Sequence, residues 1–270
     1  MADFTAKDVQ ALRQATGAGM MDAKKALTES GGDMDAARKL LREKGLAKAD
    51  DRAGRANAQG AIAVATGFCH GAGTVGLVEL KCETDFVAKS DHFVALAQEL
   101  ANSVANGGEA AVADHRHAVD DLRVSLKENI EIGRAVQITL GDGQVFDTYL
   151  HRQDGRGVNG VIVVLQGGTK DLAHDVAVHI AFAKPQFLRR EDIPADVVEE
   201  ERTTLLDITK AEGKPEAAWP KIVDGRLNGW YKERVLLEQP FVRDEKHTIA
   251  QVVDACGAEI ASFAQAFIGG

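Results

Sequence analysis

The sequence predicts an α+β protein with a three-helix N-terminal domain, a duplicated antiparallel-sheet-plus-helix core and a protruding helical hairpin. Three observations lead to this fold class. Apolar residues recur at helical spacing in the first 45 residues, β-like runs alternate with Gly-rich turns from residue 60 onward, and two stretches of that region resemble each other. A hydrophobic content of 45% with only five prolines is typical of a soluble globular protein rich in helix.

The first 45 residues predict three short helices around a small core. Thr5 and Asp8 form an N-cap pair at the start of the first helix, and two glycine-containing breaks separate it from the second and third. Gly45 is expected to end the third helix. Residues 46–59 are rich in alanine and charge without an apolar stripe, which predicts a linker that can be partly helical.

The core begins with two β-like runs, GAIAVATGF and TVGLVELKC, joined by a Gly-rich turn, which predicts a hairpin. After Thr84 the period changes to that of a long helix, whose apolar face carries Phe93, Leu96, Ala97, Leu100, Ala101 and Val104. A helix near residues 118–130 then precedes the strands RAVQITL, QVFDTYLHR and GVNGVIVVLQ. The next helix, KDLAHDVAVHIAFA, ends at Pro185.

Two stretches of the core suggest a duplication. GTVGLVELKCETD and GVNGVIVVLQGGTKD align with Gly73 on Gly157 and with Gly76 on Gly160. Each stretch passes from a strand through a threonine into a long helix. We interpret them as two copies of one hairpin-plus-helix unit.

Residues 187–232 predict a helical hairpin that projects from the core. The apolar stripe expected on its first helix is Val197, Thr204, Ile208 and Ala211, and that on its second is Ile222, Val223, Leu227 and Trp230. LLEQPFV then returns a strand to the core, and a helix with a strand-like end closes the chain. The predicted boundaries are 1–45 for the three-helix domain, 46–59 for the linker, 60–144 for the first core unit, 145–186 with 233–270 for the second, and 187–232 for the hairpin.

Charge and hydropathy exclude several classes of function. The formal charge of −9 argues against broad nucleic-acid binding, which needs clustered Lys and Arg. Residues 1–56 contain 11 Lys and Arg against 9 Asp and Glu, so the remainder carries −11 and two differently charged contact surfaces are expected. There is no apolar run near 18 residues and no signal-peptide pattern, which predicts a cytoplasmic protein without membrane contact.

No enzymatic constellation stands out. Cys69, Cys82 and Cys256 are far apart without a CxxC pair, which favours reduced thiols over disulfides or a zinc ribbon. The histidines lack metal-ligand spacing, and His179 on an apolar helix face is expected to be a core residue. GAGTVG at 71–76 matches GxGxxG, but a strand follows where the dinucleotide fold needs a helix, so a hairpin turn is favoured. These patterns alone therefore assign no catalytic residue, metal or cofactor.

The stretch CETDFVAKS at 82–90 leaves several interpretations open: a metal ligand, a cysteine active site, a helix cap, or a probe for a partner. Thr84 as N-cap with Asp85 in the first turn is a sound structural explanation. It does not account for Phe86, whose ring can equally tuck under the helix or stand out. A second ambiguous pair is Met20 and Met21, which fits either a core or an adaptable contact surface.

Taken together, the motifs of the chain resemble elongation factor Ts, the guanine-nucleotide exchange partner of the translational GTPase elongation factor Tu. The segments that carry the resemblance occur in the family's order and span nearly the whole chain. They are LRQATGAGMMDAKKAL at 12–27, TDFVAKSDHF at 84–93, HIAFAKPQFL at 179–188, EGKP at 212–215 and LLEQPFV at 236–242.

The resemblance implies a ubiquitin-associated-like N-terminal domain that docks on the nucleotide domain of elongation factor Tu, in its GDP-bound and nucleotide-free forms. Arg13, Met20 and Met21 match positions used in that docking, and His151 matches a contact to the partner's other face. The segment Thr84, Asp85, Phe86 and Val87 matches the element that disturbs magnesium in the partner, with Asp85 and Phe86 at its tip.

The resemblance also bears on the assembly state and the end of the chain. The hairpin serves homodimer formation in some members of the family, and longer members continue past FIGG into a further helical module. Two rival functions remain: a nucleotide-cofactor enzyme based on GAGTVG, which binds NAD or a nucleotide directly, and a structural adaptor that binds a partner without changing its nucleotide affinity.

Overall fold

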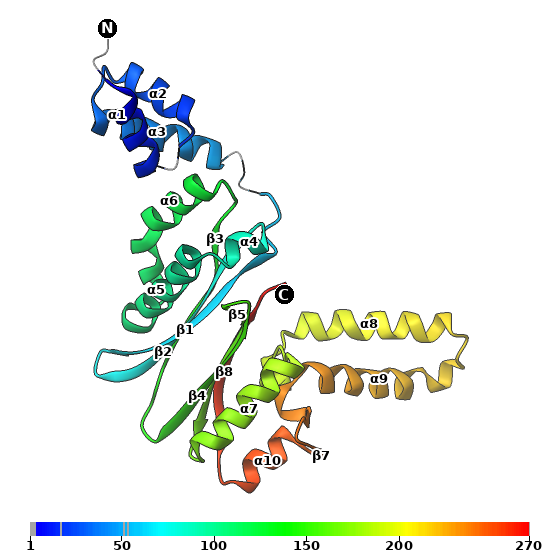
Figure 1. The fold of residues 1–270 in the computed structure, drawn as a ribbon. Coiled ribbons are helices and arrows are strands. Elements are labelled where there is room, and N and C mark those ends of the chain that lie inside the picture. The colour runs from blue at the N-terminus through cyan, green and yellow to red at the C-terminus, as the bar shows by residue number, and fades with distance from the viewer. Residues whose placement is uncertain (1–3, 17, 51, 53, 270) are drawn as a thin grey trace. The chain divides into compact units, whose positions relative to one another are not determined.

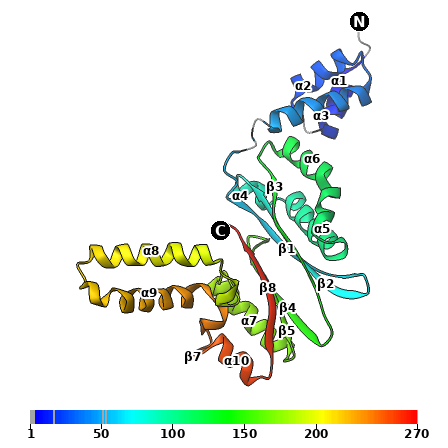
Figure 2. The ribbon, with the colours of Figure 1, turned by 180° about the vertical axis from the view of Figure 1, so that it is seen from behind.

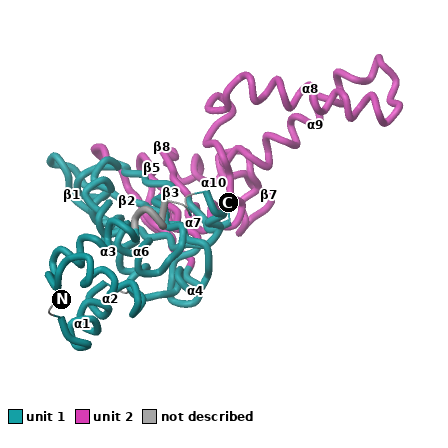
Figure 3. Tube along the Cα trace, turned by 90° about the horizontal axis from the view of Figure 1, so that it is seen from above, with its two compact units in different colours: residues 1–139, 152–158, 266–270 teal, residues 140–151, 159–265 magenta. Residues whose placement is uncertain are grey.

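The computed structural model describes every residue except 1–3, 17, 51, 53 and 270, and it divides into two compact units (Figures 1 and 3). Unit 1 comprises Met1–Thr139, Arg152–Val158 and Ala266–Gly270, and unit 2 comprises Leu140–His151 and Asn159–Gln265. Helices and antiparallel strands in both units confirm the α+β class. Over the part of the chain described, no helix is both long and apolar enough to cross a membrane.

Three helices form the N-terminal part of unit 1, as predicted: α1 (Ala6–Thr16), α2 (Met20–Glu29) and α3 (Met34–Asp50). Thr5 and Asp8 cap α1 reciprocally, since the Thr5 amide donates to the Asp8 carboxylate at 2.7 Å and the Asp8 amide donates to the Thr5 hydroxyl at 3.4 Å. The small core between the helices consists of Val9, Leu12, Ala23, Ala26, Leu27, Ala37 and Leu41.

The prediction that Gly45 ends the third helix is wrong, because α3 continues to Asp50. A Cβ atom on Gly45 would lie 2.6 Å from Cγ1 of Val124 on α6 (Arg116–Leu126). The glycine therefore allows α3 to approach α6 closely. The sequence LAKAD that follows is made mostly of good helix formers, so the helix continues for five residues into the expected linker.

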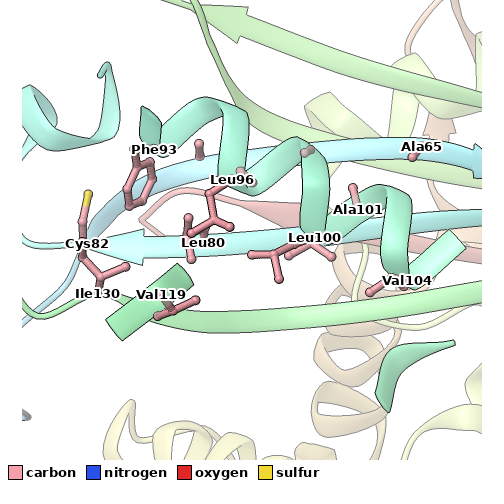
Figure 4. Close-up of a cluster of buried hydrophobic side chains, with 14 of the residues drawn as sticks. Ala65, Leu80, Cys82, Phe93, Leu96, Leu100, Ala101, Val104, Val119 and Ile130 are labelled. Carbon is pink, nitrogen blue, oxygen red and sulfur yellow. The ribbon is translucent and has the colours of Figure 1, made fainter. Parts of the chain in front are cut away.

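A three-stranded antiparallel arrangement forms the centre of unit 1. β1 (Gln59–Cys69) pairs with β2 (Ala72–Cys82) along its whole length, and β2 pairs with β3 (Glu131–Thr139), so β2 is central. The long helix α5 (Asp91–Gly107) covers one face (Figure 4). Alternating side chains of both strands meet its apolar face, as strand periodicity requires. This core includes Ala61, Ala63, Ala65, Val78, Leu80, Cys82, Phe93, Leu96, Leu100 and Val104.

The GAGTVG sequence lies in the β1–β2 hairpin and allows α5 to pack closely against the sheet. Gly71 takes a positive φ of 85° in the turn. A Cβ on Gly76 would lie 2.6 Å from the Ala105 amide nitrogen, and the Thr74 hydroxyl donates to the Ala105 carbonyl at 2.5 Å. The motif runs from the turn into β2 and does not lead to a helix N-terminus, so its glycines serve a turn and close packing, and the expected hairpin is confirmed.

In unit 2, β5 (Arg156–Gln166) has β4 (Gln144–Gln153) and β8 (Glu259–Phe267) as neighbours. Two helices, α7 (Lys170–Ala183) and α10 (Ile249–Ala255), supply the apolar side chains that pack with these strands. The short pair β6 (Pro240–Phe241) and β7 (Asp244–Thr248) follows the helical hairpin. The core of this unit includes Val161, Val163, Leu165, Val176, Ile180, Leu236, Phe241, Ile249, Val253 and Ile260.

His179 on α7 is the buried, hydrogen-bonded core histidine that the sequence predicts. Its Nδ1 accepts a hydrogen bond from the Val242 amide at 3.3 Å, which assigns the proton to Nε2, where the ring contacts the Gln239 side-chain oxygen at 3.0 Å. Burial lowers the pKa of the imidazole, with the Gln239 hydrogen bond acting in the opposite direction. The neutral ring is therefore the form that the fold accommodates.

This burial predicts a pH-dependent stability. Because the pKa of His179 is lower in the folded than in the unfolded chain, the unfolded state binds the proton more readily. The free energy of unfolding is therefore expected to fall as the pH drops below about 6.5, the usual imidazole range. Urea denaturation at pH 7 and pH 5 measures this loss, which is smaller in His179→Gln. Equal losses in the two proteins would contradict the assignment.

α8 (Ala195–Ala211) and α9 (Trp219–Arg234) lie side by side as an antiparallel pair, in both Figures 1 and 2, and form the predicted helical hairpin. On α9, Val223, Leu227 and Trp230 of the expected stripe are buried, whereas Ile222 is only half-buried. Unit 2 closes with α10 and β8, which confirms the helix and strand-like end of the sequence.

The stripe predicted on α8 is wrong by one residue. The side chains at the α9 interface are Val198, Leu205 and the fully buried Thr209, whereas Val197, Thr204, Ile208 and Ala211 are exposed. Thr209 is accommodated because its hydroxyl donates to the Leu205 carbonyl at 2.7 Å and accepts from Arg226 at 3.2 Å. Apolar residues fall on both of these neighbouring stripes, so hydrophobic periodicity alone does not decide which of them faces α9.

Candidate functional site

The corner between β2 and the short helix α4 (Asp85–Ala88) is the first candidate site. Thr84 is extended, with φ −118° and ψ 153°, and its hydroxyl accepts a hydrogen bond from the Val87 amide at 3.4 Å. Ala88 is buried in the unit 1 core and Val87 packs against it. The predicted N-cap is therefore confirmed, and the apolar end of α4 is anchored.

The helix that Thr84 caps differs from the predicted one. The sequence predicts a single long helix after this threonine, but α4 ends after four residues and Ser90, with φ −68° and ψ 140°, separates it from α5. The Ser90 hydroxyl donates to the Val87 carbonyl at 2.8 Å, which stabilises the break. As a result, residues 84–87 form a separate corner ahead of the long helix.

Glu128 holds this corner from a distant part of the chain. One carboxylate oxygen accepts from the Thr84 hydroxyl at 2.5 Å, and the other accepts from the amides of Glu83 and Thr84 at 3.0 and 3.1 Å. In return, the Glu83 carboxylate accepts from the Asn129 amide at 2.7 Å. Sequence reasoning missed this arrangement, because the KEN tripeptide before β3 carries no local signal of a partner 44 residues away.

Phe86 stands out from the corner into solvent. Its side chain is 83% exposed, more than any other large apolar residue of the described chain, while Phe93 on the neighbouring α5 is fully buried. Of the two interpretations left open for this ring, the structure shows the outward one. An aromatic ring held clear of the core adds little to folding, and such rings are typical anchors at protein interfaces.

Asp85 presents a carboxylate beside the ring. Lys89 donates to it at 2.8 Å and also reaches Asp154 at 3.3 Å. The hydrogen bond from Lys89 holds the pKa of the Asp85 carboxyl below its usual value, so the group is ionised at neutral pH. The tip thus combines a negative charge with an exposed apolar surface.

Cys82 belongs to the core of unit 1. It is fully buried, and its thiol donates to the Thr84 carbonyl at 3.3 Å. Burial, and secondly the charge of Glu128, raises the pKa of the thiol to about 12, so it stays protonated at neutral pH. The cysteine active-site interpretation is therefore wrong. A metal-ligand interpretation finds no support either, since the residues described contain no cluster of three or more metal-binding side chains.

The other candidate residues lie on the N-terminal helices and on β4. Met20 and Met21 are 49% and 74% exposed at the start of α2, while the core of this part is supplied by other residues, which excludes the core-pair interpretation. Arg13 is exposed in the last turn of α1. His151 is exposed near the end of β4 and belongs to unit 2, whereas the corner belongs to unit 1.

The corresponding corner in unit 2 shows what the fold itself requires. Thr169 has nearly the same conformation as Thr84, with φ −124° and ψ 160°, and its hydroxyl accepts from the Leu172 amide at 3.2 Å. There α7 follows directly, and Asp171 stands where Phe86 stands in unit 1. A capped strand-to-helix passage can therefore form without an exposed ring.

Comparison with known proteins identifies the family. A family model described as elongation factor TS matches residues 83–270, beginning at the corner described above. Curated relatives named Elongation factor Ts come from Renibacterium salmoninarum, at 45% identity, Clavibacter michiganensis, at 42%, and Thermobifida fusca, at 44%. Each alignment covers 100% of this chain and 99–100% of the relative. The chain therefore belongs to the elongation factor Ts family.

Proposed function

We propose that the protein is a guanine-nucleotide exchange factor of translation elongation, which associates with elongation factor Tu·GDP and promotes exchange of GDP for GTP. Membership of the elongation factor Ts family supports this proposal. The observation that carries it is the corner at Thr84–Val87, where an 83% exposed aromatic ring and an ionised carboxylate are held on a braced backbone. Such a rigid apolar tip is suited to insertion into another protein.

The mechanism follows from linkage. A GTPase holds GDP through backbone amides that surround the phosphates and through Mg²⁺, which neutralises phosphate charge. In the proposal, Phe86 wedges between elements of elongation factor Tu and Asp85 accompanies it, which displaces the groups that position the metal. Phosphate charge is then left uncompensated, and GDP leaves faster. A protein that binds the nucleotide-free GTPase more tightly than the GDP-bound form must lower the affinity of the GTPase for nucleotide by the same ratio.

Two further surfaces complete the proposed interface. Arg13, Met20 and Met21 contact the nucleotide domain of the partner, and His151 contacts its other face. Their exposure supports these roles, and the methionines offer adaptable apolar contacts. We also assign the three-helix head to the ubiquitin-associated-like class and the two core units to a duplication, which the matching caps at Thr84 and Thr169 support.

In this proposal the protein acts in the cytoplasm and by binding alone. No bond is made or broken in nucleotide exchange, so the work requires no catalytic group, metal or cofactor of this chain. GTP rebinds to the emptied partner and displaces the factor.

The affinity of elongation factor Tu for GDP, measured with and without the protein, tests the proposal at equilibrium. We expect the apparent Kd of GDP to rise with the concentration of the protein. A structural adaptor would bind and leave this Kd unchanged. A nucleotide-cofactor enzyme would instead show direct binding of NAD or a nucleotide to the isolated chain, for which the exchange-factor proposal expects none.

A further inference from the structure

We propose that Glu128 is a positioning residue for nucleotide exchange, which acts through Thr84 to hold the tip in its binding conformation. The inference rests on the proposed function. It adds a residue outside the tip, located between α6 and β3, whose carboxylate determines how Phe86 is presented.

The contacts of Glu128 are directed at the backbone that carries the tip. Its two oxygens accept three hydrogen bonds, from the amides of Glu83 and Thr84 and from the Thr84 hydroxyl. Because that hydroxyl also accepts from the Val87 amide, a chain of hydrogen bonds runs from Glu128 through Thr84 into α4. Hydrogen bonds to an ionised acceptor are about twice as strong as neutral ones.

A second, independent brace ties the segment of Glu128 to the same strand. The Asn129 amide donates to the Glu83 carboxylate at 2.7 Å, and the buried Asn129 side chain donates to the Arg55 carbonyl at 3.0 Å. Glu128 is therefore held in place by its neighbour, so its carboxylate has a fixed position from which to orient the corner. A four-residue helix has little stability of its own, since isolated short helices are unfavourable in water.

The corresponding corner in unit 2 shows that a threonine N-cap can form without a carboxylate bound to its hydroxyl. Thr169 caps α7 with the same geometry as Thr84, yet among the described residues no carboxylate binds its hydroxyl. The external carboxylate is present at the corner that carries the exposed ring and a four-residue helix. We therefore connect it with the presentation of the tip, whereas the long helix α7 is fixed by its own packing.

A double-mutant cycle on GDP release from elongation factor Tu tests this role. Glu128→Ala is expected to lower the exchange rate about tenfold, as the loss of a charge-assisted contact would. In a Phe86→Ala background, Glu128→Ala is expected to alter the exchange rate by less than about twofold, because both substitutions impair the same tip and the second has little left to remove. Glu128→Gln keeps an oxygen for the two amides and should recover part of the rate.

Two further measurements separate positioning from general destabilisation. Amide hydrogen exchange at Val87 and Ala88 should become faster in Glu128→Ala, while exchange within α5 stays as in the wild type. Glu131→Ala is the matched control, because Glu131 binds the Asn57 side chain at 2.8 Å and not the corner. This control is expected to exchange GDP at the wild-type rate. Should Glu128→Ala not fold, Thr84→Val removes the hydroxyl link and is expected to slow exchange in the same way.

The outcomes are distinct. If the wild type accelerates GDP release and Glu128→Ala does so equally well, the positioning role is wrong and the proposed function stands. Additive losses in the Glu128→Ala, Phe86→Ala double variant would show that Glu128 acts other than through the tip, which also overturns the inference. If the wild type itself fails to accelerate release, the proposed function is wrong, and the hydrogen-exchange arm still reports whether Glu128 orders α4.

Discussion

Phe86→Ala is expected to lower the rate at which the protein releases GDP from elongation factor Tu by about 30-fold, the equivalent of about 2 kcal/mol at an interface hot spot. The ring is 83% exposed and held on a braced corner, so its removal takes away apolar contact that only a partner supplies. Release of fluorescently labelled GDP, followed at several concentrations of the variant, measures the effect.

Phe182→Ala is the matched control for this prediction. Phe182 is a phenylalanine of comparable exposure, 76%, on α7 in unit 2, and it lies outside the proposed interface residues. We expect it to release GDP at the wild-type rate. Both variants should keep the wild-type free energy of unfolding to within about 0.5 kcal/mol, because neither ring is buried. Equal exchange rates for Phe86→Ala and Phe182→Ala would remove Phe86 from the mechanism.

Gly76→Ala is expected to lower the free energy of unfolding by about 1–3 kcal/mol, although it adds only a single methyl group. The new Cβ would lie 2.6 Å from the Ala105 amide nitrogen and 2.7 Å from the Ala101 carbonyl oxygen. Both atoms belong to the backbone of α5, so the helix must move away from the sheet and the packing in the unit 1 core must loosen. Chemical denaturation followed by circular dichroism measures the loss.

Gly225→Ala provides the opposite expectation with the same chemical change. A Cβ at Gly225 on α9 meets no atom within 4 Å, so alanine should stabilise the protein by about 0.5–1 kcal/mol through its better helix propensity. This contrast also tests the assignment of GAGTVG as a packing motif. If the Gly76→Ala protein were as stable as the wild type, the close packing of α5 on the sheet would not require a glycine at position 76.

Local rules predicted a large part of the fold. The caps at Thr5 and Thr84, the β1–β2 hairpin and the apolar face of α5 each depend on residues close together in the sequence, and the structure confirms them. The burial of His179 was predicted for the same reason, because its position on the apolar face of α7 can be read from helical spacing. The domain boundaries assigned from the sequence stay a prediction.

The parts that were missed depend on contacts between distant segments. A side chain at Gly45 would clash with Val124 on α6, so this glycine serves close packing inside α3, and the buried Thr209 of α8 accepts a hydrogen bond from Arg226 on α9. Glu128 braces the candidate site across 44 residues, and a single sequence gives no sign of such a partner. The exposure of Phe86 could not be decided from local pattern either, since an aromatic residue beside a cap fits both an inward and an outward ring.

The rate of GDP release from elongation factor Tu, measured with increasing amounts of the wild-type protein, tests the central claim most directly. If the exposed tip drives exchange, the rate should rise with concentration and saturate as the complex forms, and substoichiometric amounts should suffice because the factor is displaced by GTP. A release rate that stays at the value for elongation factor Tu alone, at micromolar concentrations of this protein, would contradict the account.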